Sequence, residues 1–134
     1  MTLPLAGIRV LDLSNVLAGP FCTYQLAIMG AEVIKVERPG TGDLARRLGA
    51  DGDLNAAAMG ASFLAQNAGK KSLTLDLKKP AGEEAFLCLA GTAHVLVENF
   101  RPGVMARLGL GHEELRQSCP KLVYCSISGF GQTG

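Results

Sequence analysis

One short stretch carries more varied chemistry than its neighbours. Residues 95–97 are apolar, and the next six, 98–103, are Glu, Asn, Phe, Arg, Pro and Gly. Arginine offers paired hydrogen bonds to phosphate and a flat face on which a purine can stack. Phe100 stands among polar residues, where an aromatic ring has no evident place in a core. Pro102 and Gly103 are typical of a turn that lets backbone approach a ligand. The stretch predicts a binding loop.

Two further arginines fall in comparable surroundings. Arg38 follows the apolar-rich segment 32–37, and Arg107 lies shortly after the loop that contains Arg101. A single arginine of this kind is more often a solvated loop charge. The binding hypothesis therefore requires that the fold bring these side chains together.

The elements that must position them alternate between strand-like and helix-like. Strands are predicted at residues 8–14, 32–37, 72–77, 94–98 and 122–128. Several of these are apolar nearly throughout, as in parallel strands covered on both faces. Helices are predicted at 20–30, at 54–66 behind a capping Asp53, at 80–90 and at 112–118, and residues 39–53 as a surface loop. This order predicts an α/β fold, with an open, mostly parallel sheet and helices on both faces.

Ligands of such sheets bind beyond the carboxyl ends of the strands. The loop after the first strand, SNVLAGP, leads into a helix whose first N–H groups could hold an anion, but it has no G-x-G-x-x-G motif. Glu37 stands where a ribose-binding acid would, yet Arg38 follows it directly. These features favour a nucleotide-bearing ligand other than a dinucleotide.

Three other polar features have structural explanations. Asp12 and Asp76 lie inside apolar segments and are expected to accept backbone hydrogen bonds from neighbouring loops. Lys70 and Lys71 precede a strand and are expected to belong to a solvated loop, although phosphate contact is an alternative.

Composition narrows the class of protein. Of 134 residues 48% are apolar, which is enough for one globular domain over residues 1–134. The 13 basic and 12 acidic residues nearly cancel, which argues against nucleic-acid or membrane-surface binding. No apolar run approaches the ~20 residues of a membrane span, and no secretory signal is visible. Four cysteines form no C-x-x-C pair: Cys22, Cys88, Cys119 and Cys125. We expect reduced, mostly buried thiols, no metal site and a cytoplasmic location.

Five motifs in order carry a resemblance over essentially the whole chain. They are PLAGIRVLDLSNVLAGP, GAEVIKVERPGTGD, NAGKKSLTLDLKKPAG, VENFRPGVMARLGL and PKLVYCSISGFGQTG. The set resembles the N-terminal portion of the family III CoA-transferases (CaiB/BaiF type), which include formyl-CoA, carnitine and succinate-hydroxymethylglutarate CoA-transferases. The resemblance implies a Rossmann-like large domain and a homodimer with interlocked chains.

The resemblance also implies an activity. Such enzymes move CoA from an acyl-CoA donor to a carboxylic acid acceptor, through an anhydride and an aspartyl-CoA thioester. CoA is then a substrate, and no permanently bound cofactor is implied. The nucleophilic aspartate of the family lies beyond the GFGQTG motif, so no catalytic residue is expected before Gly134. We expect the chain to be a fragment that is inactive in isolation.

By position, the resemblance assigns eight residues to the CoA site: Val16, Ala18, Arg38, Leu75, Asn99, Phe100, Arg107 and Leu108. Arg38 would contact the adenine-nucleotide end, and Leu75 would lie beside the adenine. Leu17 stands where the formate-specific enzymes have a glutamine, so the resemblance does not extend to formate or oxalate specificity.

Two alternatives remain open. An α-methylacyl-CoA racemase shares the scaffold and CoA cradle but abstracts an α-proton with acid–base residues. The sequence VENF and the long insert at 39–66 favour the transferase. The second alternative is a non-catalytic CoA-binding fragment, for which titration with free CoA is the discriminating observation.

Overall fold

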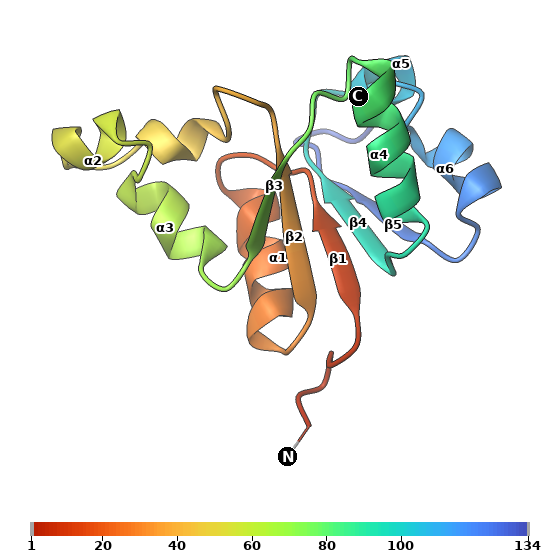
Figure 1. Ribbon diagram of the computed structural model, residues 1–134, viewed down its shortest axis with the longest axis horizontal. Coiled ribbons are helices and arrows are strands. Elements are labelled where there is room, and N and C mark those ends of the chain that lie inside the picture. Colours follow the sequence, from red (N-terminus) through yellow and green to blue (C-terminus); the bar gives the residue numbers. More distant parts are fainter. Residues whose placement is uncertain (1, 134) are drawn as a thin grey trace.

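The computed structural model describes residues 2–133 and contains an open sheet with helices packed against it (Figure 1). The strands are β1 (Arg9–Asp12), β2 (Glu32–Glu37), β3 (Lys71–Thr74), β4 (Val95–Glu98) and β5 (Val123–Ser126). The helices are α1 (Ala18–Ile28), α2 (Gly52–Ala56), α3 (Ala61–Asn67), α4 (Pro80–Ala90), α5 (Val104–Arg107) and α6 (His112–Ser118), with a short 3₁₀ helix, η1 (Leu44–Arg47).

All five strands run parallel, in the order β3-β2-β1-β4-β5. The chain builds the sheet outward from β1 to β3, then crosses back to place β4 on the other side of β1. Loops after β1 and β4 therefore diverge to opposite faces, which opens a crevice at the carboxyl edge between them. The open, parallel α/β sheet expected from the sequence is confirmed.

The two faces of the sheet bury different cores, because alternate residues of a strand point to opposite faces. The larger core lies under α4, α5 and α6 and contains Leu11, Leu13, Val36, Phe86, Ala90, Leu96, Met105, Leu110 and Leu115. The smaller core lies under α1 and contains Val10, Val33 and Val97. Figure 1 shows α1 and α4 on opposite sides of the sheet, so the expected covering of both faces is confirmed.

The α1 face becomes polar toward the carboxyl edge of the sheet. Asp12 lies two residues after Val10 on β1, and Lys35 lies two after Val33 on β2, so both share the face of the smaller core. The register pairs Asp12 directly with Lys35. A buried acid and a buried base therefore stand side by side where the apolar core ends.

The region from 39 to 67 differs most from expectation. The single helix predicted over 54–66 is divided into α2 and α3, and Ala58 between them has a φ of 57°. The capping side chain of α2 is that of Asp51, which accepts from the amides of Asp53 and Leu54, rather than Asp53 itself. Repeated alanines favour helix at each residue, but they carry no signal for where a helix must stop.

Helix α4 begins at Pro80 and ends at Ala90 as predicted, although Gly82 weakens its helix propensity. A Cβ at position 82 would lie 2.1 Å from the carbonyl oxygen of Asp76. Glycine is therefore required for the close approach of the 75–78 segment to α4, and this contact fixes a segment that borders the site described below.

Other expectations need correction. Residues 39–53 are not wholly a surface loop, since they contain η1 and the buried Asp43 and Ala45. Strand β3 lies at the sheet edge and is exposed throughout. Cys88 is exposed and the other three cysteines are half-buried, so the thiols are not mostly buried.

None of the helices described within 2–133 has the length and apolar character to cross a membrane.

Candidate functional site

A cavity of about 490 Å³ opens beyond the carboxyl ends of β1, β2, β3 and β4. It is lined by Leu13, Asn15, Val36, Glu37, Arg38, Thr41, Gly42, Leu75, Asp76, Leu77, Lys78, Phe100, Val104 and Leu108. The lining combines apolar walls with a few charged and amide groups, as small-molecule sites do. We call this the central cavity.

Four of the eight predicted CoA-site residues meet in the central cavity: Arg38, Leu75, Phe100 and Leu108. They come from three separate strand-end segments, so the fold brings together groups that are distant in sequence. Phe100 is half-buried and also packs against the larger core. The sequence argument that its ring has no core role is therefore wrong, because the ring serves the core and the cavity together.

Arg107 lines an adjoining cavity of about 540 Å³. The two cavities share four residues, Leu77, Lys78, Val104 and Leu108, and so form a continuous depression. Lys78 was not predicted as a site residue, yet it borders both cavities and adds an exposed cation. The sequence signal for it was its position just after the strand predicted at 72–77.

The remaining three predicted residues are not in the cavity lining. Asn99 is half-buried, and its side chain accepts from the Asn15 amide (2.7 Å) and donates to the Asn15 carbonyl oxygen (2.8 Å). It therefore acts on the central cavity through Asn15, which does line it. Val16 and Ala18 are exposed where the chain enters α1.

The loop that carries Phe100 is fixed at both ends. Glu98, at the end of β4, is buried, and its Oε2 accepts from the Phe100 amide at 2.8 Å. Gly103 has a φ of 79° and caps α5. A side chain at this left-handed position would be strained, so the turn chemistry predicted for Pro102 and Gly103 is explained.

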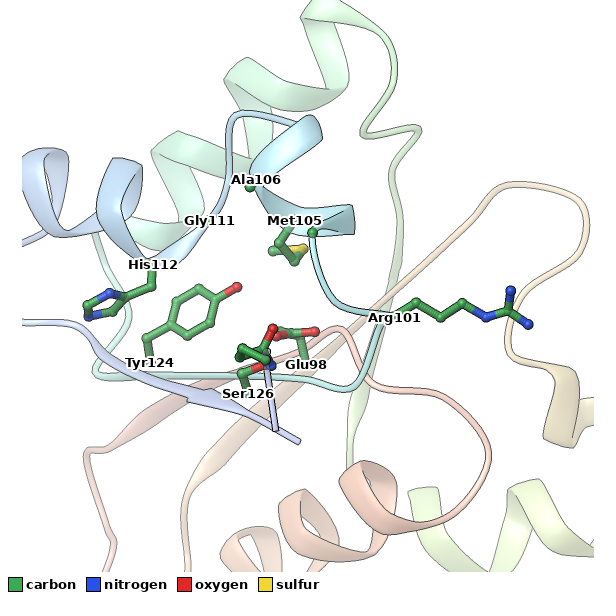
Figure 2. Close-up of a pocket in the computed structure, with 10 residues that line it drawn as sticks. Glu98, Arg101, Met105, Ala106, Gly111, His112, Tyr124 and Ser126 are labelled. Atoms are coloured by element: carbon green, nitrogen blue, oxygen red, sulfur yellow. The ribbon is translucent and has the colours of Figure 1, made fainter. Parts of the chain in front are cut away.

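Arg101 does not line the central cavity. It borders a different cavity of about 330 Å³, and Figure 2 shows its guanidinium extending away from Glu98 and Tyr124. Burial raises the pKa of the Tyr124 phenol, and the neighbouring Glu98 carboxylate raises it further. The structure thus joins Arg38 and Arg107 along one depression and leaves Arg101 out.

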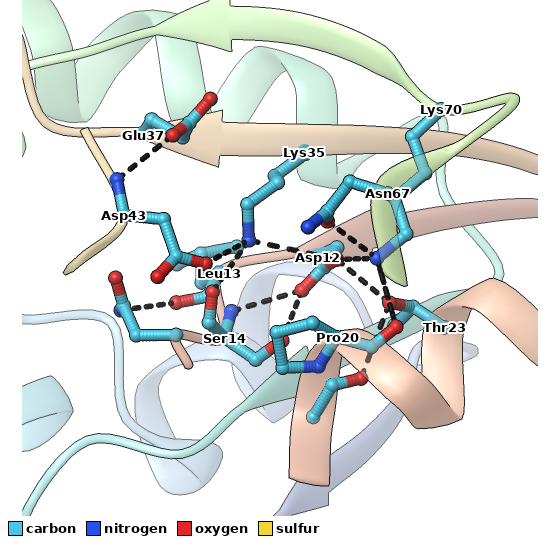
Figure 3. Close-up of polar contacts among 12 residues, drawn as sticks. Asp12, Leu13, Ser14, Pro20, Thr23, Lys35, Glu37, Asp43, Asn67 and Lys70 are labelled. Atoms are coloured by element: carbon cyan, nitrogen blue, oxygen red, sulfur yellow. Dashed lines mark hydrogen bonds and ion pairs between the residues drawn. The ribbon is translucent and has the colours of Figure 1, made fainter. Parts of the chain in front are cut away.

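Behind the turn after β1 lies a buried polar network that sequence reasoning missed (Figure 3). Lys70 is predicted to be solvated, but its side chain is 1% exposed. Its Nζ donates to Asp12 Oδ2 (2.8 Å), Thr23 Oγ1 (2.7 Å) and Asn67 Oδ1 (2.8 Å), and to the Pro20 carbonyl oxygen. The lysine ties α1 and α3 to the end of β1.

Asp12 accepts from the Ser14 amide at 2.9 Å, as the sequence predicted, but also from the Ser14 and Thr23 hydroxyls and from Lys70. Burial alone would raise the pKa of Asp12, but the nearby ammonium groups of Lys35 and Lys70 outweigh it, so its pKa is lowered. Burial lowers the pKa of Lys70.

Asp76, half-buried after β3, accepts a hydrogen bond from the Lys78 amide at 3.1 Å.

Lys35 and Asp43 extend the network to the next loop. Lys35 Nζ lies 2.9 Å from Asp43 Oδ2 and 4.0 Å from Asp12 Oδ2, and it donates to the Ser14 carbonyl oxygen at 2.8 Å. Asp43 Oδ1 accepts from the amides of Val16 (3.0 Å) and Ala45 (2.9 Å). A lysine inside the apolar run of β2 was the available signal, because a buried lysine needs an acidic partner.

Glu37 is engaged by the protein rather than free for a ribose. Arg46 holds both of its oxygens (2.8 and 2.6 Å), and the Asp43 amide donates to Oε1 at 2.8 Å. Burial acts to raise the pKa of Glu37, but the hydrogen bonds from Arg46 and Asp43 outweigh it and lower the pKa. The Arg46 guanidinium also lies over the Phe63 ring, 3.7 Å from its centre.

The sheet order, the crevice beside β1 and the cavity at the carboxyl edge define a Rossmann-like ligand-binding fold. The sequence model of CoA-transferase family III matches residues 5–134. The chain belongs to that family.

Individual relatives agree with this assignment. Succinyl-CoA:glutarate CoA-transferase of Mus musculus is 47% identical over 131 residues, which are 98% of this chain and 29% of that protein. Succinate–glutarate CoA-transferase of Agrobacterium fabrum is 50% identical over 137 residues, which cover 98% of this chain and 34% of that protein. The crystal structure of a CaiB/BaiF family protein from Brucella suis superposes with a TM-score of 0.87 at 39% identity. The match covers 100% of this chain and 35% of that one. The chain spans about a third of the length of these relatives.

Proposed function

We propose that this chain is the coenzyme A-binding part of a CoA-transferase that acts on an acyl-CoA and a carboxylic acid. The observation that carries the proposal is the convergence of Arg38, Leu75, Phe100 and Leu108 on one cavity beyond the strand ends. Family membership supports the reaction type. Residues 1–134 would act as one Rossmann-like domain.

Three acids, Glu37, Asp76 and Glu83, also line the depression, and Glu37 is already paired with Arg46. The cations of the depression suit coenzyme A, whose nucleotide end carries several phosphates. Arg38 and Lys78 border the central cavity, and Arg107 borders the adjoining one. Guanidinium groups bind phosphate through paired hydrogen bonds, and lysine acts as a point charge. Leu75, Phe100 and Leu108 supply apolar surface for the adenine. Phosphates would therefore follow the cations while the base covers the apolar wall.

The overall exchange is balanced without a further reactant. The acyl-CoA thioester bond breaks, the donor acid leaves as a carboxylate, and the acceptor carboxylate becomes the new thioester. We propose that it proceeds through a mixed anhydride and an aspartyl-CoA thioester, with the nucleophilic aspartate contributed by sequence outside these 134 residues. We further propose a homodimer, as the resemblance implies, and a cytoplasmic location, as the cysteine pattern indicates.

The names of the quoted relatives favour transfer over racemisation, because both curated relatives are CoA-transferases. They also suggest succinyl-CoA as donor and a dicarboxylic acid such as glutarate as acceptor. The complete gene product should be assayed with succinyl-CoA against dicarboxylic and hydroxy acids. Exchange with none of them, together with racemisation of an α-methylacyl-CoA, would refute the transferase proposal.

Binding can be tested on the chain itself. Calorimetric titration with free CoA should show one site, and Arg38→Ala and Phe100→Ala should each weaken it about tenfold, equivalent to ~1.4 kcal/mol. Arg47→Ala is the matched control, since Arg47 is an exposed arginine of η1 outside the lining of both cavities. Equal affinity in all variants would show that the site assignment is wrong.

A further inference from the structure

The turn between β1 and α1 holds an unusual backbone conformation at Val16. Its φ is 68°, in the left-handed region. For a β-branched residue this is a genuine outlier, because the side chain crowds the backbone there. Such strain persists only where the surroundings over-determine the conformation, and it clusters at functional sites. The adjacent residue, Asn15, lines the central cavity.

Three successive residues of this turn are held by side chains from three different places in the chain. Lys35 Nζ, on β2, donates to the Ser14 carbonyl oxygen at 2.8 Å. The Asn99 side chain, after β4, bonds to both the amide and the carbonyl oxygen of Asn15. Asp43 Oδ1, before η1, accepts from the Val16 amide at 3.0 Å. Long-range contacts, not local sequence preference, therefore determine the path of the turn.

Asp43 is itself fixed. It is 1% exposed, its Oδ2 is paired with Lys35 Nζ at 2.9 Å, and its own amide donates to Glu37 Oε1. Figure 3 shows Asp43 with its amide toward Glu37, at the end of β2, and its carboxylate toward the Lys35 ammonium. Asp43 therefore holds the peptide between Asn15 and Val16 in place, while Leu17 already accepts the first helical hydrogen bond, from the Phe21 amide. The left-handed φ of Val16 is what joins these two fixed ends.

We propose that Asp43, supported by Lys35, is a positioning residue that imposes the left-handed conformation on Val16. It thereby sets the wall of the central cavity that Asn15 forms. Without it, Val16 would relax to an ordinary extended or right-handed conformation and strain the two hydrogen bonds by which Asn99 holds Asn15, which shifts this wall of the cavity. The inference concerns the same cavity as the proposed function, and it rests on that function only where CoA is the reporter.

A double-mutant cycle separates this role from a merely structural one. Asp43→Ala should weaken CoA binding to the chain about tenfold when residue 16 is valine. In the Val16→Gly background the same Asp43→Ala change should weaken it no more than about twofold, because glycine adopts positive φ at little cost. A general loss of stability would weaken binding equally in both backgrounds. Equal losses, or no loss in either, would overturn the proposal.

A measurement on the unaltered chain covers the case in which Asp43→Ala does not fold. Val16 is an exposed residue, yet its amide should exchange with solvent deuterium as slowly as amides of β1, because its acceptor is buried. Fast exchange of this amide would overturn the inference whatever the variants do. If the unaltered chain shows slow exchange but does not bind CoA, the proposed function fails while the positioning role of Asp43 stands.

Discussion

The two sides of the central cavity are built in opposite ways. On the β1–β2 side, the turn at Asn15 and Val16 rests on buried charges, with Lys35, Lys70 and their acidic partners behind it. The Glu37–Arg46 pair at the end of β2 belongs to the same side. On the β4 side, the Phe100 loop rests on the larger apolar core, and Glu98 supplies its hydrogen-bonded anchor. We refer to these as the charged wall and the apolar wall.

Because of this difference, we expect the two walls to respond differently to substitution. A buried ion network depends on every partner, because removal of one leaves another charge without compensation in a low-dielectric interior. The stability of an apolar wall depends on how well its side chains fill the space between them, so a substitution of similar size costs little. The charged wall should therefore be rigid but intolerant of change, and the apolar wall more tolerant.

The largest effect is expected at Lys70. Its ammonium is the hub that joins Asp12, Thr23 and Asn67. Lys70→Ala leaves Asp12 with less positive charge in a buried site, which should lower the free energy of unfolding by ~3–5 kcal/mol. Urea denaturation followed by circular dichroism measures this change.

The adjacent residue provides the control. The Lys71 side chain is 69% exposed and pairs with Glu32 at the surface, so Lys71→Ala should cost less than ~1 kcal/mol. The two variants remove the same side chain one position apart. If their effects are equal, the charged wall has no special role in stability.

The next largest effect is expected at Met105, a buried residue of the larger core beneath the apolar wall. Met105→Ala should lower the free energy of unfolding by ~2–4 kcal/mol, and Met105→Leu by less than ~1.5 kcal/mol, because leucine nearly conserves volume. The same denaturation experiment tests both. A leucine variant as unstable as the alanine variant would contradict the tolerance expected of the apolar wall.

The contrast between the walls also explains what the sequence could predict. The loop of the apolar wall was predicted at its position, since a hydrophobic run located β4 and Pro-Gly marked the turn at 102–103, but the packing of Phe100 against the larger core was not. The parallel order followed from the alternation of strand and helix. Placing Arg38 and Phe100 at one cavity required only that fold and the rule of strand carboxyl ends.

The charged wall was not foreseen, because its contacts join residues far apart in sequence. Lys70 and Asp12 are separated by 58 positions, and Lys70 lies beside the solvated Lys71, which has the same residue type. Only burial distinguishes the two, and burial is a property of the assembled fold. The break between α2 and α3 was missed for a related reason, since η1 and α3 pack together through tertiary contacts that alanine propensity does not encode.

A smaller effect is expected at Glu98, the single charged anchor of the apolar wall. Glu98→Gln keeps an acceptor for the Phe100 amide but loses the charge, so the cost should be ~1 kcal/mol. Urea denaturation measures this cost, and Glu84→Gln, at an exposed position of α4, is the control. An equal cost for the two variants would show that Glu98 is not a special anchor of the loop.

The smallest effect is the response of the charged wall to acid. The pKa values of Asp12 and Glu37 are lowered in the folded chain from ordinary values of 3.8 and 4.5. The unfolded chain therefore binds protons first as the pH falls. Their stabilising contribution is complete above about pH 5 and is lost as the pH falls through 4.5 and 3.8 toward the lowered folded-state values. Free energies of unfolding measured between neutral pH and pH 3 should thus decrease on acidification.

Glu37→Gln should make this decrease shallower, because one of the two groups no longer titrates. Glu84→Gln removes the same formal charge from an exposed position on α4 and should leave the slope close to that of the unaltered chain. Arg46 bonds to both oxygens of Glu37 at short distances, so Glu37 should contribute even though the guanidinium is partly exposed. Equal slopes for the two variants would mean that acid sensitivity arises from general surface charge, and that the charged wall contributes to stability without conferring pH dependence.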